Sequence, residues 1–352
     1  MSVTVDISEL KSKGYTVVKD VMSPEDCDKY INIYSNWLAQ FNDSWPISSN
    51  SLIQRYGIGH MEPSWGTRQK SKKVFEQIWG TDQLLTSFDA VAIGRPPEDG
   101  EETFAVPGKH WLHCDQGVER VGLHAYQGAV YLEAADEDDW TFEVLEGSHL
   151  LHKEFFETFP RAKIRSITNK FYGLTDGDVE WYSSHDGVTR RRVPAPKGGM
   201  IIWDSRLIHA NVRPMENRRH PGRWRYAVFV SMGPAIWASK EYLRQKKQAY
   251  QGLRMTSHWP CNGLALFSDM EVGGIMATEK LPDIACTDDA KRLAGVLPYL
   301  GQKKGPPWRP EWAEGSREGR EMTRGSTPLW VVLGVAAISI VTALFVKKSF
   351  MG

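Results

Sequence analysis

The sequence lacks a dense cysteine pattern, a net charge and an apolar N-terminal segment. Its four cysteines, Cys27, Cys114, Cys261 and Cys286, form no C-x-x-C pair, which argues against a zinc ribbon or a disulfide scaffold and favours a reducing compartment. Lys and Arg total 43, and Asp and Glu also total 43, so no nucleic acid is expected as a partner. The opening MSVTVDISELKSKGY has no apolar stretch, so neither a signal peptide nor a transit peptide is expected.

The chain also lacks internal repeats and long low-complexity segments. One region, residues 298–326, is rich in Gly, Pro and charge. It has too little apolar content to fold alone and is predicted to be a flexible linker. The 352 residues are therefore assigned to one large domain at 1–297, the linker at 298–326, and a C-terminal segment at 327–348.

The C-terminal segment carries a long uncharged run, residues 329–346 (LWVVLGVAAISIVTALFV), followed directly by Lys347 and Lys348. At helical rise the run spans roughly 27 Å, enough for a thin bilayer. A buried core helix would show a polar face, and here only Ser339 and Thr342 are polar. The pattern predicts a single-pass tail anchor that leaves the large domain facing the cytosol, at the endoplasmic reticulum or an organelle outer membrane.

The large domain is predicted to be mainly β with flanking helices. Ser23 followed by Pro24 and two acidic residues predicts a helix that runs through about residue 39. From about residue 89 to 235 short apolar runs are broken by Gly, Pro and Asp, which is typical of a β-sandwich or barrel. Residues 237–251 again look helical and stop at Gly252.

A His-x-Asp triplet, His113 to Asp115, follows an apolar run. Residues two apart on a strand project to the same face, so both side chains could reach one metal. Alone the signal is weak, because composition predicts roughly 0.6 such triplets per chain by chance.

A third candidate ligand, His209, follows the buried-strand pattern GGMIIWDS, and the next strand, RYAVFV, opens on arginines. Two histidines and one carboxylate on a face of iron leave three open sites, as a bidentate 2-oxo acid and O2 require. A guanidinium at a strand start could hold the far carboxylate of that acid.

These segments resemble the phytanoyl-CoA dioxygenase family of the 2-oxoglutarate/Fe(II) oxygenases. The likeness covers about residues 10–235 and rests on GYTVVKDVMSPEDCDKY, HCDQ, QGAVYLEAAD, VLEGSHL, and WDSRLIHAN followed by RYAVFV. The resemblance implies a double-stranded β-helix core of the jelly-roll or cupin-like type. It implies His113, Asp115 and His209 as iron ligands, and Asn211 and Arg225 as residues that bind 2-oxoglutarate.

Two departures from the family pattern concern the co-substrate. Asn211 stands where the family commonly has Ser. Arg225 lies 16 residues beyond His209, across the insertion PMENRRHPGRW, which is farther than usual. Of the competing arginines, Arg223 shares the strand face of Arg225 and is the reserve. Arg218 and Arg219 are less favoured because they do not adjoin the apolar strand.

Several other residues carry weaker expectations. Pocket-lining roles are predicted for Gln127, Tyr131 and Trp203. His149 is expected to be a structural turn residue, and His110 is an alternative proximal ligand without an acidic residue two positions on. Residues 190–192 (RRR) are expected in a solvated loop, or else to bind an anionic group.

The sequence thus predicts an enzyme that uses Fe(II), 2-oxoglutarate and O2 to hydroxylate a C–H bond of a lipid, an acyl-CoA or a small organic substrate. Two alternatives stay open. One is an inactive, membrane-anchored scaffold on the same fold, and the other is a zinc hydrolase that uses the same His/Asp/His set.

Overall fold

The computed structural model describes residues 3–99, 110–267, 275–302 and 304–306, all within the first of two compact units, residues 1–315. Much of the predicted linker and the whole predicted anchor, 327–348, lie outside the described residues. Within the described ranges, no helix combines the length and the apolar character that a bilayer crossing requires. The membrane anchor therefore stays a prediction.

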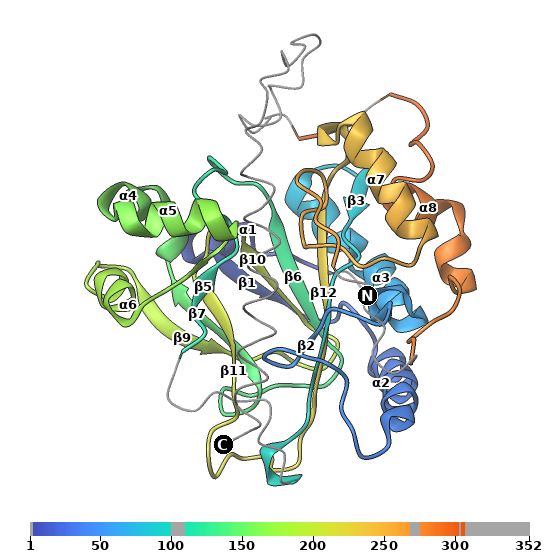
Figure 1. The fold of residues 1–352 in the computed structure, drawn as a ribbon, viewed down its shortest axis with the longest axis horizontal. Helices are drawn as coiled ribbons and strands as arrows, with labels where there is room; N and C mark the ends of the chain where they lie inside the picture. The colour runs from blue at the N-terminus through green and yellow to red at the C-terminus, as the bar shows by residue number, and fades with distance from the viewer. Residues whose placement is uncertain (1–2, 100–109, 268–274, 303, 307–352) are drawn as a thin grey trace, which may run out of the picture. The chain divides into compact units, whose positions relative to one another are not determined.

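Two antiparallel sheets form the centre of the large unit, as Figure 1 shows. The larger sheet has the order β1 (Tyr15–Val18), β10 (Met200–Asp204), β6 (Tyr126–Tyr131), β12 (Arg225–Pro234), β4 (Val91–Gly94) and β2 (Leu52–Ile53), and β3 (Leu84–Thr86) also pairs with β12. The smaller sheet has the order β8 (Tyr172–Gly173), β5 (His113–Cys114), β11 (His209–Val212), β7 (Thr141–Glu146) and β9 (Thr189–Val193). This arrangement confirms the mainly-β prediction and is consistent with a cupin-like jelly roll.

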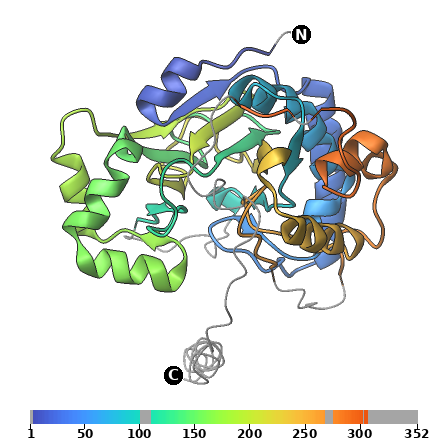
Figure 2. The ribbon, with the colours of Figure 1, turned by 90° about the horizontal axis from the view of Figure 1, so that it is seen from above.

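Helices flank both sheets. They are α1 (Ile7–Lys13), α2 (Pro24–Leu38), α3 (Glu62–Trp79), α4 (His152–Thr158), α5 (Pro160–Asn169), α6 (Asp176–Ser183), α7 (Lys240–Gln251) and α8 (Asp288–Leu293). In Figures 1 and 2, α4, α5 and α6 (green) cluster on one side and α7 and α8 (gold and orange) on the other. Buried aromatic side chains of α4 and α6, with Ala162 of α5, pack with residues of the smaller sheet, whereas α3 contacts β12 of the larger one.

Helix α2 begins as its sequence predicts. The Ser23 hydroxyl accepts a hydrogen bond from the Asp26 N–H at 3.1 Å, and Pro24 occupies the first helical position. The residues at helical spacing, including Tyr34 and Trp37, are buried against the main core. Local capping and one apolar face therefore suffice to place this helix.

His149 has the structural role expected of it. Its Nε2 lies 3.0 Å from the Lys11 carbonyl oxygen, and its side chain is buried after β7. It packs against Gly14, which has a φ of 88° and ends α1; a Cβ there would clash with the imidazole. The histidine thus ties α1 to the sheet and lies outside the metal centre.

The prediction of a loop at residues 190–192 was wrong. These arginines lie in β9, an edge strand that pairs with β7. Arg190 forms an ion pair with Glu143 at 2.8 Å, and Arg191 forms one with Glu146 at 3.0 Å. Cross-strand charge pairs compensate for the low apolar content of an exposed edge strand, which the composition of the segment alone did not reveal.

Candidate metal centre

The three predicted metal ligands meet where β5 and β11 pair. His113 and His209 are direct partners in the antiparallel register, and Asp115 follows β5. The Nε2 atom of His113 lies 3.5 Å from one carboxylate oxygen of Asp115, and Nε2 of His209 lies 3.4 Å from the other. One ligand atom from each residue falls within 4.8 Å of the others, so a single metal ion can bind all three.

Backbone carbonyls orient both imidazoles. Nδ1 of His113 lies 2.9 Å from the Trp111 carbonyl oxygen, and Nδ1 of His209 lies 2.9 Å from that of Leu207. In each ring Nδ1–H can donate to the carbonyl, which leaves the Nε2 lone pair directed at the centre. In a metal-ligating histidine the second ring nitrogen is usually hydrogen-bonded in this way. The donor set therefore fits a divalent transition metal.

The protonation states also favour metal binding. Burial opposes ionisation of Asp115, but the imidazoles of His258 and His113 outweigh it and hold the pKa of Asp115 well below its usual value. Burial, with the neighbouring His113, lowers the pKa of His209. Burial likewise disfavours charged His113, but its hydrogen bond with Asp115 prevails and raises its pKa. A metal ion would therefore meet an ionised carboxylate.

A cavity of about 890 Å³ opens on the triad. This volume is typical of small-molecule sites. Aromatic side chains form much of its wall: Trp111, Phe142, Phe171, Trp203, Phe229 and Trp259. Of the three residues expected to line a pocket, Gln127 and Trp203 line this cavity, whereas Tyr131 does not and instead lies against Arg225.

Three cavity residues were not foreseen. Asp89 precedes β4, and burial raises its pKa to about 7. Nε2 of His258 is buried without a hydrogen-bond partner among the described residues. Arg120 lies in the loop after β5. Each comes from a different segment and belongs to no local motif, so no signal in the sequence could have grouped them.

Arg225 lies directly behind the cavity wall. It is the first residue of β12 and only 2% exposed. Its guanidinium donates to Asn211 Oδ1 at 2.7 Å, to the Tyr131 hydroxyl at 3.4 Å and to the Ser51 hydroxyl at 3.3 Å. Asn211 itself lines the cavity. No described carboxylate forms an ion pair with Arg225. Only the Asn211 side chain separates its buried positive charge from the cavity beside the triad.

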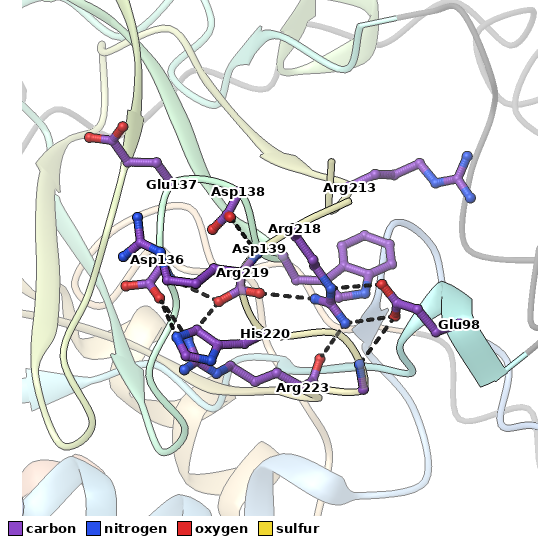
Figure 3. A network of polar contacts seen from close by, with 12 residues as sticks. Glu98, Asp136, Glu137, Asp138, Asp139, Arg213, Arg218, Arg219, His220 and Arg223 are labelled. Atoms are coloured by element: carbon purple, nitrogen blue, oxygen red, sulfur yellow. Dashed lines mark hydrogen bonds and ion pairs between the residues drawn. The ribbon is translucent and has the colours of Figure 1, made fainter. Parts of the chain in front are cut away.

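The other arginines of the insertion are held elsewhere, in the network of Figure 3. Arg223 pairs with Asp136 at 3.1 Å and with Asp139 at 2.7 Å. Arg218 pairs with Asp139 at 3.0 Å and with Glu98 at 2.8 Å. The geometry thus favours Arg225 over the reserve Arg223 as a residue able to serve the cavity.

Asp139→Ala is expected to lower the free energy of unfolding by about 3 kcal/mol, because it leaves the fully buried Arg218 without a buried counterion. The measurement is urea unfolding followed by tryptophan fluorescence. Asp138→Ala is the matched control, because Asp138 accepts only a backbone hydrogen bond from Arg219 in this network, and it should cost much less. Equal losses in the two variants would contradict this interpretation.

The remaining candidate ligands lie apart from the triad. His110, the alternative proximal ligand, pairs with Asp176 at 3.2 Å. A second acidic group, Asp136, Asp138 and Asp139, is also close enough to hold an ion. Arg218 and Arg223 already compensate the charges of Asp139 and Asp136, so this group serves to hold the insertion.

The chain is similar in sequence to one curated protein and in structure to several solved ones. No family model matches the chain. Ava biosynthesis cluster protein O of Aspergillus versicolor is 24% identical over 271 residues, which cover 72% of this chain and 84% of that protein. The crystal structure of GlcNAc Inducible Gene 2 (GIG2, DUF1479) from Candida albicans matches with a TM-score of 0.56 at 13% identity, over 85% of this chain and 77% of that one.

A further solved structure is that of EctD from S. alaskensis with 2-oxoglutarate and 5-hydroxyectoine. It matches with a TM-score of 0.42 at 14% identity, over 64% of this chain and 73% of that one. The match to GIG2 supports a shared fold, and the chemistry has to be argued from the residues of the site.

Proposed function

We propose that this chain is an Fe(II)- and 2-oxoglutarate-dependent dioxygenase that hydroxylates a C–H bond of a lipid, an acyl-CoA or a small organic substrate. The observation that carries the proposal is the buried His113/Asp115/His209 triad on a cavity whose wall contains Asn211 backed by Arg225. It is the combination of a facial ligand set with a separate buried cation that points to a metal-chelating co-substrate with a second carboxylate.

The protein's own residues have distinct roles under this proposal. His113, Asp115 and His209 would hold the iron on one side and leave its other positions facing the cavity. The Asn211–Arg225 pair would bind the far carboxylate of 2-oxoglutarate, since a guanidinium can hold a carboxylate bidentately. The aromatic wall would exclude water from the substrate. When bound, the iron with 2-oxoglutarate and O2 would supply the oxidation of the C–H bond.

The proposed kinship with the phytanoyl-CoA dioxygenase family rests on the order of motifs from residue 10 to 235. The relative from A. versicolor is named for a biosynthesis cluster, which favours a small-molecule substrate. We also propose that residues 327–348 tether the enzyme to a membrane with the catalytic domain in the cytosol. A tether would raise the local concentration of amphiphilic substrates.

Anaerobic addition of Fe(II) and 2-oxoglutarate to the purified protein is expected to produce a weak visible charge-transfer band. The band requires 2-oxoglutarate to chelate iron through its oxo and carboxylate oxygens. Zn(II) serves as the control metal and should give no band. A protein that binds neither iron nor 2-oxoglutarate would be the inactive scaffold, and one that hydrolyses an ester with zinc would be the hydrolase.

A further inference from the structure

The loop after β5 presents a second arginine, Arg120, to the same cavity. A buried glutamine holds this loop in place: the Gln116 side-chain amide donates to the carbonyl oxygens of Arg120, at 2.8 Å, and of Gly122, at 2.6 Å. The Ser205 hydroxyl donates to the other end of the Gln116 side chain at 2.7 Å. The position of Arg120 is therefore set by the core.

The guanidinium of Arg120 is also held from several sides. It lies over the Trp259 ring at 3.9 Å from the centroid, and its Nη1 is 3.2 Å from Nδ1 of His124. Gly263, at a φ of 73°, borders it so closely that a Cβ would clash with Nη2. A side chain confined in this way loses little conformational entropy when it binds a ligand.

Arg120 forms no ion pair with any carboxylate that the structure describes. Its neighbour Glu119 pairs instead with Lys170 at 2.7 Å. Burial lowers the pKa of Arg120 to about 10, which still leaves it cationic at neutral pH. Burial lowers the pKa of the cavity residue His258; Asp115 opposes this shift, and the charge of Arg120 adds to it. A partly desolvated cation without a counterion thus stands in the cavity of the metal centre.

We propose that Arg120 is a specificity-determining residue that binds a carboxylate group of the substrate while the aromatic wall holds the substrate's apolar body. This inference rests on the proposed function. The two arginines then have different ligands: Arg225, behind Asn211, binds the co-substrate, and Arg120 binds the substrate. A single guanidinium can bind one carboxylate group. Lys170, the other Lys or Arg side chain that lines the cavity, already forms an ion pair with Glu119, so a substrate with one carboxylate fits best. Small organic acids are accordingly favoured over neutral lipids.

Matched pairs of a carboxylate and its primary amide test the inference. The pairs are 3-phenylpropionate, 1-naphthaleneacetate and octanoate with their amides, titrated by calorimetry into the full-length chain loaded with Zn(II). In the wild type at least one carboxylate should bind about tenfold more tightly than its amide, the usual size of a charge-assisted contact. Arg120→Gln should remove this preference and leave amide affinity unchanged, and Arg120→Lys should restore part of it.

Arg95→Gln is the matched control. Arg95 also stacks on aromatic rings, 5.1 Å from the Trp45 centroid and 5.8 Å from that of Trp224, but it lines a separate groove. This variant should keep the preference, and melting temperatures verify that each variant folds. The inference is overturned if no carboxylate is preferred or bound, if Arg120→Gln keeps the preference, or if Arg95→Gln alone removes it.

The iron and 2-oxoglutarate band, measured in parallel, separates the two proposals. Arg120→Gln should form the band as the wild type does, because Arg120 is assigned to the substrate. A wild type without the band refutes the proposed function, whereas the calorimetry decides the role of Arg120 in either case.

Discussion

Replacing Asp115 by alanine is expected to remove iron from the protein and to abolish succinate formation. Asp115 bridges both imidazoles, at 3.5 Å from His113 and 3.4 Å from His209, and it is the only carboxylate of the triad. Even the outer partners of metal ligands typically change affinity or activity by about 10–100-fold, so loss of a direct ligand should exceed that range. The measurements are the iron content after anaerobic reconstitution and the rate of succinate release.

Asp136→Ala provides the matched control for this variant. Asp136 belongs to the second acidic group that could hold an ion, but its partners are Arg223 and His220. This control should keep the iron content and the succinate rate of the wild type. Undiminished turnover in Asp115→Ala, or loss of iron only in Asp136→Ala, would refute the assignment of the metal centre.

Arg225→Gln is expected to raise the KM for 2-oxoglutarate by about 10- to 100-fold, the usual worth of hydrogen bonds to a charged group. The guanidinium is buried and donates to Asn211 at 2.7 Å, so the far carboxylate would lose the cation assigned to it. At saturating 2-oxoglutarate much of kcat should return, since the variant leaves the triad intact. Initial rates of succinate formation against 2-oxoglutarate concentration separate the two parameters.

Arg223→Gln is the control, because Arg223 lies two residues before Arg225, just outside β12, and was the alternative choice from the sequence. It pairs with Asp136 and Asp139, so its loss should affect stability and leave the KM for 2-oxoglutarate unchanged. A raised KM in Arg223→Gln together with a normal KM in Arg225→Gln would reverse the assignment.

Short-range signals in the sequence predicted much of the fold. Ser23 and Pro24 begin α2 as expected, and Gly252 follows the end of α7. The β-rich segment of residues 89–235 holds most strands of both sheets. The segment at 190–192 was misassigned because its arginines are compensated by Glu143 and Glu146 on a strand far away in the sequence.

For the site, the sequence supplied the ligand candidates but not their surroundings. His113, Asp115 and His209 lie together, because the antiparallel pairing of β5 with β11 sets the two histidines side by side. Tyr131 faces Arg225 and not the cavity. The position of a residue on a strand predicts a face of the sheet, but which part of that face opens on a cavity depends on packing between the sheets.

The sequence by itself determined the elements that depend on near neighbours: the helix caps, the alternation of the strands, the His-x-Asp pair and the apolar run at 329–346. Only the tertiary structure decided which charges are compensated. It placed Arg218 and Arg223 against Asp139 and left Arg225 and Arg120 without an acidic partner among the described residues. Charge compensation depends on distances across the fold, and these distances arise from the packing of the whole unit.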